Sequence, residues 1–458
     1  MSIFDIKGNL MKDEDGLNII NGSSYKVRIA KTNNRDERVD FTSYDVKGKY
    51  LIYPSSVGLT PSTESLTKDY VGSPSSESYL GATTYAGDIS FGAFVNSNAY
   101  YMSLIWANVH TKENTGNIIC INCFSDFSIK MHKNENTIAM LEIIREDENG
   151  FYSDFIDIYD SMTQQELIDA INNIKNIKAF LITGDKNDKV DFTNFLEEFE
   201  EEEDNYLISF KRVGFIESGV FSEEAKKLYP RFVNIISPRF GETQYYNLAL
   251  FDSSKNIEGI QYIGCESKSM SFNFANKALT QITSSLWASD EYTLDKDSIL
   301  KEERAEDRDI IMAQTSKYPT KLFINGTEAT SVSDIAIAFE WTKEEKFNVS
   351  AKRYNFPNNK FTLTFSGNAV FNTQSKELFY NRVLNGDRQS FVIYSKTKFR
   401  GKDYPFIFVS ADVSGSPSFP TIESKDISVS LNNFKASEDS IEMKNNYLIA
   451  FTDRVELF

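Results

Sequence analysis

The chain of 458 residues is long enough for two or three domains, and with 41% hydrophobic residues it can bury real cores, which excludes a disordered protein. Its 36 Phe and 23 Tyr favour β structure, because aromatic side chains suit pleated, half-buried surfaces. The net charge of −17 argues against a protein that grips nucleic acid, since affinity for phosphates comes from Lys and Arg.

The first 43 residues are polar and predict an arm or a first hairpin. The N-terminus has no signal-peptide pattern, and no apolar run in the chain approaches the ~20 residues needed to span a bilayer. We therefore expect a protein made in a cytoplasm, with no membrane partner. Tyr44–Tyr53 predicts a strand, and Pro54–Tyr79, rich in Ser, Thr, Gly and Pro, predicts a long surface loop that bridges to a neighbour if the protein forms a ring.

A strand pattern with an internal glycine occurs twice, at Thr84–Phe91 and Thr364–Phe371. Gly87 and Gly367 align, and each has an aromatic residue two positions before it and Phe four positions after it. A glycine inside a strand predicts a β-bulge or a close backbone approach.

A second repeated stretch begins at Phe232 and again at Phe391, and each copy runs to a Glu-Ser-Lys sequence. An alternating strand follows each copy, Met270–Phe274 in the first and Ile427–Leu431 in the second. The offset of this stretch, 391 − 232 = 159, is smaller than the offset of the glycines, 367 − 87 = 280. Two copies of one β unit in a chain suggest a ring or array built from fewer chains than units.

The difference between the offsets, 280 − 159 = 121 residues, measures extra chain in the first copy. This insertion contains a strand pattern at Ile138–Ile144, a capping box that opens a helix at Thr163, and a strand pattern at Ala179–Thr183. Phe192–Phe199 predicts a second helix and Tyr206–Val213 another strand. We expect a small α/β decoration on the outside of a β scaffold.

The predicted fold class is mainly β, with duplicated β-sandwich or half-barrel domains and an inserted small α/β domain. The charged segment Asp297–Met312 predicts a linker helix between the two units. The expected domains are 1–111 with 231–294 for the first β unit, 112–230 for the insertion, 295–319 for the linker and 320–458 for the second β unit.

The sequence offers little for catalysis, and we predict no catalytic, cofactor or metal residues and no enzyme. Two His residues in the whole chain argue against a Ser-His-Asp site, and the Gly-rich phosphate loops are missing. Cys120 and Cys123 form a lone C-x-x-C in an apolar strand pattern, whose period of two puts them on opposite faces, so they predict buried structural cysteines. The acidic run 197–204 predicts a solvated face.

Four basic residues alternate along one segment of the second unit, which would put them on one face of an extended strand. The matching positions of the first unit hold one cation, so we predict contacts between stacked rings here and not a DNA clamp. The four residues are Lys396, Lys398, Arg400 and Lys402.

Residues Tyr85–Phe91 with Cys265–Asn276, and Phe365–Phe371 with Ile422–Asn433, carry a resemblance to the tail tube (major tail) proteins of tailed bacteriophages. The resemblance covers about half of the chain, at the level of patterns. It implies stacked rings that close an inner β-barrel around the passage of the genome. For a duplicated chain it implies homotrimeric rings with pseudo-sixfold symmetry in the virion tail, assembled in the bacterial cytoplasm, with the tape measure protein and genomic DNA as transient lumen partners.

The polar residues that alternate along the two strands after Glu-Ser-Lys predict one face for the lumen and one for packing. They are Ser271 and Asn273 in the first copy and Ser428 and Ser430 in the second. Three alternatives remain: another ring component of a tail or baseplate, a carbohydrate-binding or carbohydrate-hydrolysing β protein, and a binding module whose insertion is a displayed adhesion domain.

Overall fold

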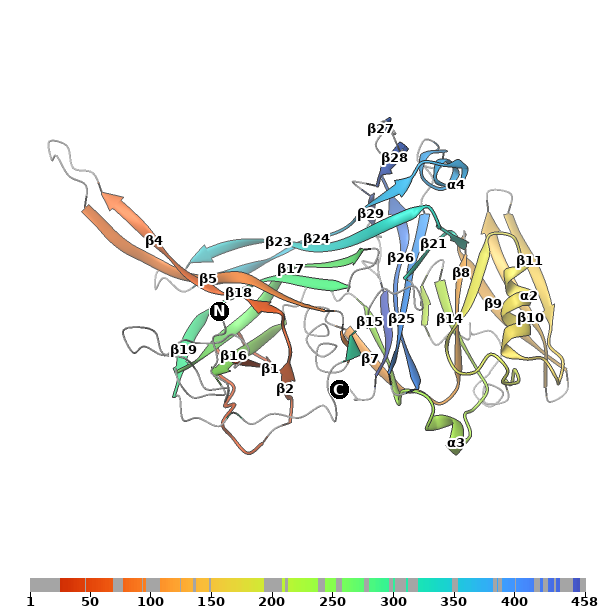
Figure 1. Ribbon diagram of the computed structural model, residues 1–458, viewed down its shortest axis with the longest axis horizontal. Helices are drawn as coiled ribbons and strands as arrows, with labels where there is room; N and C mark the ends of the chain where they lie inside the picture. Colours follow the sequence, from red (N-terminus) through yellow and green to blue (C-terminus); the bar gives the residue numbers. More distant parts are fainter. Residues whose placement is uncertain are drawn as a thin grey trace, which may run out of the picture.

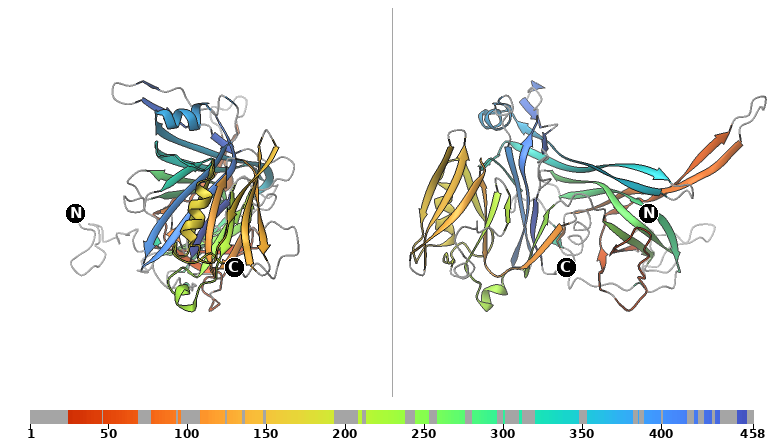
Figure 2. Two further views of the ribbon diagram at one scale, coloured as in Figure 1. Left: turned by 90° about the vertical axis from the view of Figure 1, so that its right-hand side faces the viewer. Right: turned by 180° about the vertical axis from the view of Figure 1, so that it is seen from behind.

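The protein is mainly β, as its composition predicts, and most strands belong to one extended hydrogen-bonded sheet of 21 strands. The molecule is elongated, with a projecting hairpin at one end and a three-stranded sheet at the other (Figures 1 and 2). The computed structural model describes residues 25–45, 47–68, 77–92, 94–95, 108–123, 125–134, 137–147, 150–192, 208–210, 213–237, 244–252, 258–275, 280–295, 300, 310–311, 320–347, 353–381, 385, 389–399, 401–415, 421–422, 427–431, 434–436 and 448–453.

The first part of the extended sheet contains the first described strand of the chain. Its order is β2 (Lys49–Ile52), β1 (Tyr25–Thr32), β16 (Tyr245–Asp252), the first half of β17 (Gly259–Ala275) and β19 (Asp290–Leu294). Val27 and Ile29 alternate along β1 and are buried. Residues 25–32 form a strand whose partners β2 and β16 both lie beyond residue 43, and residues 1–24 lie outside the described ranges, so the predicted arm or hairpin within the first 43 residues stays a prediction.

The second part is called the long sheet here. Its order is β4 (Thr60–Lys68) with β3 (Ser56–Val57), β5 (Glu77–Gly92), β18 (Gln281–Ala288), the second half of β17, β23 (Val332–Phe347), β24 (Arg353–Val370), and β28 (Ile427–Ser430) with β27 (Thr421–Ile422) and β29 (Phe434–Ala436). The predicted loop Pro54–Tyr79 is wrong over most of its length, because β4 and β5 form a hairpin that projects from the body (Figure 1). The Thr residues that made this stretch look like a loop are also good strand formers.

The third part is called the scaffold sheet. Its order is β7 (Asn108–Glu113), β15 (Phe232–Ser237), β30 (Leu448–Asp453), β26 (Lys402–Ser414), β25 (Gln389–Phe399), β21 (Lys321–Ile324) and β22 (Thr327–Glu328). A short helix α4 (Thr373–Ser375) and the π-helical turn η3 (Lys376–Asn381) lie between β24 and β25 in the chain.

A separate pair of short strands corrects the predicted linker helix. β6 (Phe94–Val95) pairs with β20 (Ile310–Ile311), so the end of the segment Asp297–Met312 is extended and not helical. Two consecutive β-branched residues at this point favour a strand over a helix. Residues 297–299, 301–309 and 312 of that segment lie outside the described ranges.

The insertion leaves the scaffold sheet after β7 and returns at β15, and these two strands pair as antiparallel neighbours. In the described residues it is mainly β, with one sheet β12-β8-β14-β13 and another β11-β10-β9. Its elements are β8 (Asn117–Cys123), β9 (Phe127–Asn134), β10 (Thr137–Asp147), β11 (Gly150–Asp157), α2 (Gln164–Asn172), β12 (Ile177–Thr183), β13 (Ile208–Phe210), β14 (Val213–Ser218) and α3 (Glu223–Lys226).

The helix predicted at Thr163 is confirmed. The Thr163 side chain accepts a hydrogen bond from the backbone N–H of Glu166, and the Glu166 carboxylate accepts one from the Thr163 N–H at 2.8 Å. Leu167 and Ile171 of α2 are buried against the β8 sheet. The helix predicted at Phe192–Phe199 lies outside the described residues beyond Phe192.

The described strands of the insertion form two layers with an apolar cluster on each side of β8. Cys120 faces a cluster shared with the scaffold sheet, and Cys123 faces a cluster inside the insertion, so the prediction of opposite faces is confirmed. Both thiols are buried and unbonded to sulfur, and burial raises the pKa of the Cys120 thiol well above its usual value. A thiol held in the neutral form in this way is a packing residue and not a nucleophile.

The insertion is not a loosely attached decoration, because its β8 sheet packs face to face on the scaffold sheet. Phe215 and Cys120 share one cluster with Val392, Ile407 and Val409 of the second predicted unit. All seven residues of β8 are buried, because apolar clusters cover both faces of this strand. The insertion therefore departs from one predicted unit and rests on a sheet to which both units contribute, since Val233 and Ile235 belong to the same cluster.

A buried polar network fixes this interface. The Asn122 side chain donates to Ser390 Oγ at 2.9 Å and accepts from the backbone N–H of Gly326 at 2.8 Å. Ser390 Oγ lies 3.1 Å from the carbonyl oxygen of Cys123, to which it donates, and the Ser390 N–H donates to Asn325 Oδ1 at 2.8 Å. The two hydrogen bonds of Ser390 Oγ, with Asn122 and with the Cys123 carbonyl oxygen, join residues that lie more than half of the chain apart, and polar groups in such a site must be satisfied internally.

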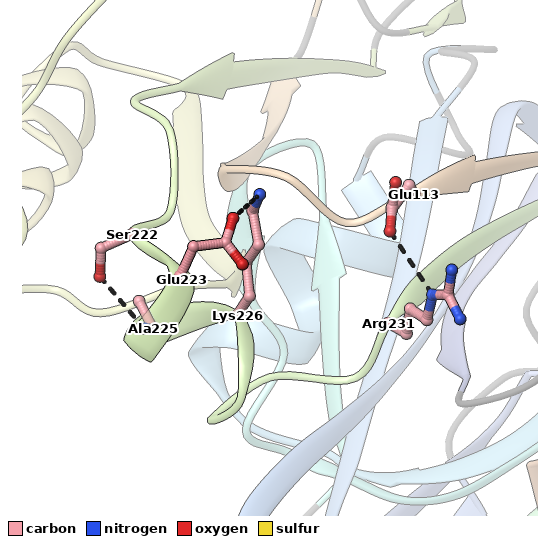
Figure 3. A network of polar contacts seen from close by, with 6 residues as sticks. All are labelled: Glu113, Ser222, Glu223, Ala225, Lys226 and Arg231. Carbon is pink, nitrogen blue, oxygen red and sulfur yellow. Dashed lines mark hydrogen bonds and ion pairs between the residues drawn. The ribbon is translucent and has the colours of Figure 1, made fainter.

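The neck of the insertion carries exposed ion pairs (Figure 3). Arg231 Nε lies 3.4 Å from Glu113 Oε1 where the chain returns, and Lys226 Nζ lies 2.8 Å from Glu223 Oε1 on α3. Ser222 caps α3 by accepting from the backbone N–H of Ala225 (Figure 3). Exposed pairs of this kind contribute little to stability, so we attribute the attachment of the insertion to the buried interface.

We expect Asn122→Ala to lower the free energy of unfolding by about 1–3 kcal/mol, because it leaves the Gly326 N–H without its acceptor in a dry interface. Urea denaturation monitored by tryptophan fluorescence measures the change. The control is Asn173→Ala at the exposed end of α2, which should change the value by less than about 0.5 kcal/mol. Equal losses in both variants would contradict a structural role for the network.

Both repeated glycines lie where a neighbouring backbone approaches closely, as predicted. A Cβ at Gly87 would lie 2.0 Å from the carbonyl oxygen of Gly58, and one at Gly367 would lie 2.4 Å from that of Asp334. At Gly367 the partner strand β23 carries a bulge between Val332 and Asp334. The repeated glycine thus has the same physical cause in both copies.

Gly87→Val should therefore destabilise the protein by more than about 2 kcal/mol, because the clash involves backbone that cannot rotate away. Gly58→Ala is the control in the facing segment between β3 and β4, since its Cβ would meet only the Asp88 oxygen at an ordinary 3.6 Å. Thermal unfolding followed by circular dichroism compares the two. A Gly87→Val protein as stable as the control would refute the close approach.

Candidate functional site: the polar face of the long sheet

The two predicted units meet in the long sheet through one pair of strands. β17 of the first unit pairs with β23 of the second from Ser269 opposite Glu340 to Ala275 opposite Asp334. β17 also pairs with β18, which pairs with β5, and β23 pairs with β24, which pairs with β28. The result is one continuous sheet that begins in the first unit and ends in the second.

One face of this sheet is polar across its whole width. Directly paired residues point to the same face, so the register alone defines a row that runs from strand to strand. The residues of this polar face are Asp88 and Ser90 on β5; Gln281, Thr283 and Ser285 on β18; Ser269, Ser271 and Asn273 on β17; Asp334, Ala336, Ala338 and Glu340 on β23; and Thr362, Thr364, Ser366 and Asn368 on β24.

Hydrogen bonds tie neighbouring strands together along the polar face. Ser90 Oγ and Thr283 Oγ1 lie 3.1 Å apart, and Ser285 Oγ donates to Asp88 Oδ1 at 2.5 Å. Asn368 Nδ2 donates to Asp334 at 3.2 Å across the β23–β24 pair. These six side chains are short and engage one another across the strand pairs.

The opposite face seals the largest apolar core. Phe272, Ile337 and Phe365 alternate with polar-face residues and are fully buried in one cluster that spans both predicted units. The Phe272 ring lies 6.0 Å from that of Phe339 across the junction, in an edge-to-face arrangement. Burial of one face and exposure of the other is the pattern of an antiparallel sheet that meets water on one side.

The charged residues of the polar face are Asp88, Asp334 and Glu340, which are all acidic. The rest of the defined positions are small or uncharged. Within these positions phosphate groups meet no cation and are weakly repelled, and the same register continues beyond them to Lys360, which pairs with Thr342.

The residues predicted to face a lumen fall on this sheet. Ser271 and Asn273 belong to the polar face, and Asn273 is exposed to solvent. β28 places Ser430 opposite Asn368 and Ser428 opposite Val370 at the far side of the sheet. The structure thus brings the four residues into one sheet, and their role as lumen residues stays a prediction.

The strands beside the two copies of the Glu-Ser-Lys stretch occupy different places in the sheet. Glu266–Lys268 lie within β17 next to a bulge, whereas 423–426 lie between β27 and β28, outside the described residues. β17 is separated from the glycine strand β5 by β18, whereas β28 pairs directly with the glycine strand β24. We expected Met270–Phe274 and Ile427–Leu431 to be equivalent strands. This expectation is wrong, because the first is separated from its glycine strand by one further strand and the second is not. The duplication stays a prediction.

Sequence reasoning missed the contributions of β18 and β23 to the polar face. Gln281, Thr283 and Ser285 alternate with Ile282 and two further inward residues, which is a period-two signal. That signal was present, but nothing local indicates that β17 pairs with β23, because strand pairing over such sequence distances leaves no mark in a single sequence.

The prediction that the four ring-contact cations share one face of one strand is wrong, because Lys396 and Lys398 lie on β25 and Lys402 begins the antiparallel strand β26. Lys396 Nζ lies 3.0 Å from Asp403 Oδ2, and Lys402 Nζ donates to the backbone oxygen of Tyr229 in the returning insertion at 3.1 Å. Lys398 is exposed, and Arg400 lies outside the described residues. Two of the four cations thus have contacts within the chain, and a role between rings remains a prediction.

Among the residues that the structure describes, no group of three His, Cys, Asp or Glu side chains is placed to hold a metal ion. Within the same ranges no helix is both long and apolar enough to cross a bilayer. The chain matches no known family model, and no curated protein is significantly similar to it in sequence.

Proposed function

We propose that this protein is a structural virion protein that forms the tail tube of a bacteriophage, a conduit for delivery of the genome into the bacterial host. The observation that carries this proposal is the long sheet, because strands from both predicted units present one polar, acidic face while the other face seals the core. A conduit wall needs these properties: it must stay wet, and it must let phosphates slide past.

In a ring, a neighbouring chain can pair with the open edge of the long sheet. Within the described residues no strand pairs with the outer side of β4, and an open edge is a place where another chain can pair. Three chains joined at such edges form a closed pseudo-hexameric ring, and closure removes the exposed edges. The rings stack into a tube around the tape measure protein and then the genomic DNA. They assemble in the host cytoplasm, without a cofactor and without catalysis.

Negative-stain electron microscopy of the overexpressed protein tests this proposal. We expect hollow rings or tubes with a pseudo-sixfold outline, because each chain contributes two wedges. Purified virions should contain many copies of the chain per particle, as a tube requires and a baseplate ring does not. A monodisperse monomer that never assembles, alone or with virion components, would refute the proposal.

The charge of the polar face should also decide whether an assembled tube binds DNA. In Asp88→Lys with Glu340→Lys, two acidic positions become cationic, and duplex DNA should bind to the assembled tubes at low salt and dissociate as salt rises. Unmodified tubes should not retain DNA in the same co-sedimentation assay. Glu224→Lys with Glu377→Lys is the control, because it adds the same charge at exposed positions outside the long sheet and should not retain DNA to the same extent. If the double variant retained no DNA, the face would not line the passage.

A further inference from the structure

A groove on the insertion lies at the end of the molecule opposite the projecting hairpin, between β11 and α2 (Figure 1). Its volume is about 500 Å³. Its floor is apolar, since Met162 and Ile156 are nearly fully buried beneath it. The residues that line it are Phe155, Ile156, Asp157, Tyr159, Met162, Glu166, Asp169, Ala170, Asn173 and Ile174.

One wall of the groove is the edge of a strand. Phe155, Ile156 and Asp157 are consecutive in β11, and successive side chains of a strand point to opposite faces. A groove that touches all three, and then Tyr159 and Met162 after the strand, lies at the edge of β11 where the strand ends. In the described residues β11 pairs with β10 on one side and with no strand on the other. Its backbone edge can therefore accept a further strand.

The other wall is one stripe of α2. Glu166, Asp169 and Ala170 follow the spacing i, i+3 and i+4, which places them on a single helix face, and the C-cap residue Asn173 and then Ile174 continue the wall beyond the helix. The helix is fixed by its capping box and by its buried apolar face, so this wall is rigid. A strand edge facing a helix stripe leaves room for one extended chain.

The rim of the groove carries exposed aromatic rings. Phe155 is 57% exposed and Tyr159 is 48% exposed, and Phe151 farther along β11 is 76% exposed. Single exposed apolar residues are ordinary, but aromatic rings grouped beside a concave surface are typical of interaction sites. The aromatic rings can cover every second side chain of a bound strand, and they can pack against the aliphatic stems of long side chains.

Every charged residue that lines the groove is acidic, namely Asp157, Glu166 and Asp169. Glu166 is engaged at the cap of α2, and Asp169 accepts a hydrogen bond from Gln165 at 2.8 Å, so both carboxylates are held in place. An occupant with complementary charge carries Lys or Arg side chains.

We propose that this groove binds an extended peptide segment of a partner protein, rich in Lys or Arg, which adds to β11 as a fourth strand of its sheet. Backbone hydrogen bonds to β11 supply the docking geometry, and the carboxylates and aromatic rim select basic side chains. This site is separate from the polar face of the long sheet and does not depend on the tube function.

A carbohydrate is the main competing ligand, since aromatic rings and carboxylates also bind sugars. The strand edge decides for a peptide, because a row of alternating N–H and C=O groups is complemented by another backbone and not by a sugar ring. The distinction can be tested directly, because methylation of a peptide's backbone nitrogens blocks the strand pairing and leaves the charge unchanged.

Fluorescence anisotropy with the full chain tests the site. The probe is a labelled decapeptide of alternating lysine and threonine, compared with an alternating glutamate and threonine peptide and with the lysine peptide methylated on alternate backbone nitrogens. We expect binding of the lysine peptide alone, and a loss of at least about tenfold on methylation. Asp169→Lys should weaken binding by about fivefold. Tyr159→Ala should also weaken binding.

Glu224→Lys is the matched control, because it makes the same charge change on exposed α3 and should leave the affinity unchanged. Circular dichroism verifies that each variant is folded. Equal binding of the methylated peptide, or equal losses in Asp169→Lys and Glu224→Lys, would show only general attraction to an acidic protein and overturn the proposal. Binding of neutral oligosaccharides that Tyr159→Ala abolishes, without binding of the lysine peptide, would assign the groove to carbohydrate instead.

Discussion

The pairing of β17 with β23 is the constraint on which the architecture depends. It joins the first predicted unit to the second by a ladder from Ser269–Glu340 to Ala275–Asp334, and the aromatic core beneath it belongs to both. Without this ladder the polar face would be two narrow sheets with four open edges. With it, the two units act as one rigid plate, and any surface they present is a property of the whole chain.

The sequence allows the local features of the fold to be predicted wherever a periodic or steric rule applies. The strand period placed Cys120 and Cys123 on opposite faces, the capping box located α2, and the internal glycines indicated close backbone contacts at Gly87 and Gly367. Each of these rules acts over a few residues, so a single sequence contains all that they need.

The failures have a common physical origin in long-range structure. The β4–β5 hairpin looked like a loop because its Ser and Thr residues suit both states, and its pairing decides between them. The polar face could be foreseen only through Ser271, Asn273 and the β28 serines, because the neighbours of each strand are set by the fold. The groove beside β11 could not be foreseen, since its two walls come from different elements and only their approach creates it.

The seating of the insertion has a consequence for how such a chain can diversify. The two ends of the insertion join neighbouring strands of the scaffold sheet, and this geometry allows a whole domain to be replaced without moving the strands that carry it. Yet its inner sheet covers Val392 and Ile407, and Asn122 bonds to Ser390, in a part of the gene far downstream. A recombination event that replaced the insertion alone would leave these apolar side chains of the scaffold sheet without a complementary surface. Its evolutionary history is therefore tied to that of the C-terminal region, and the two must change together.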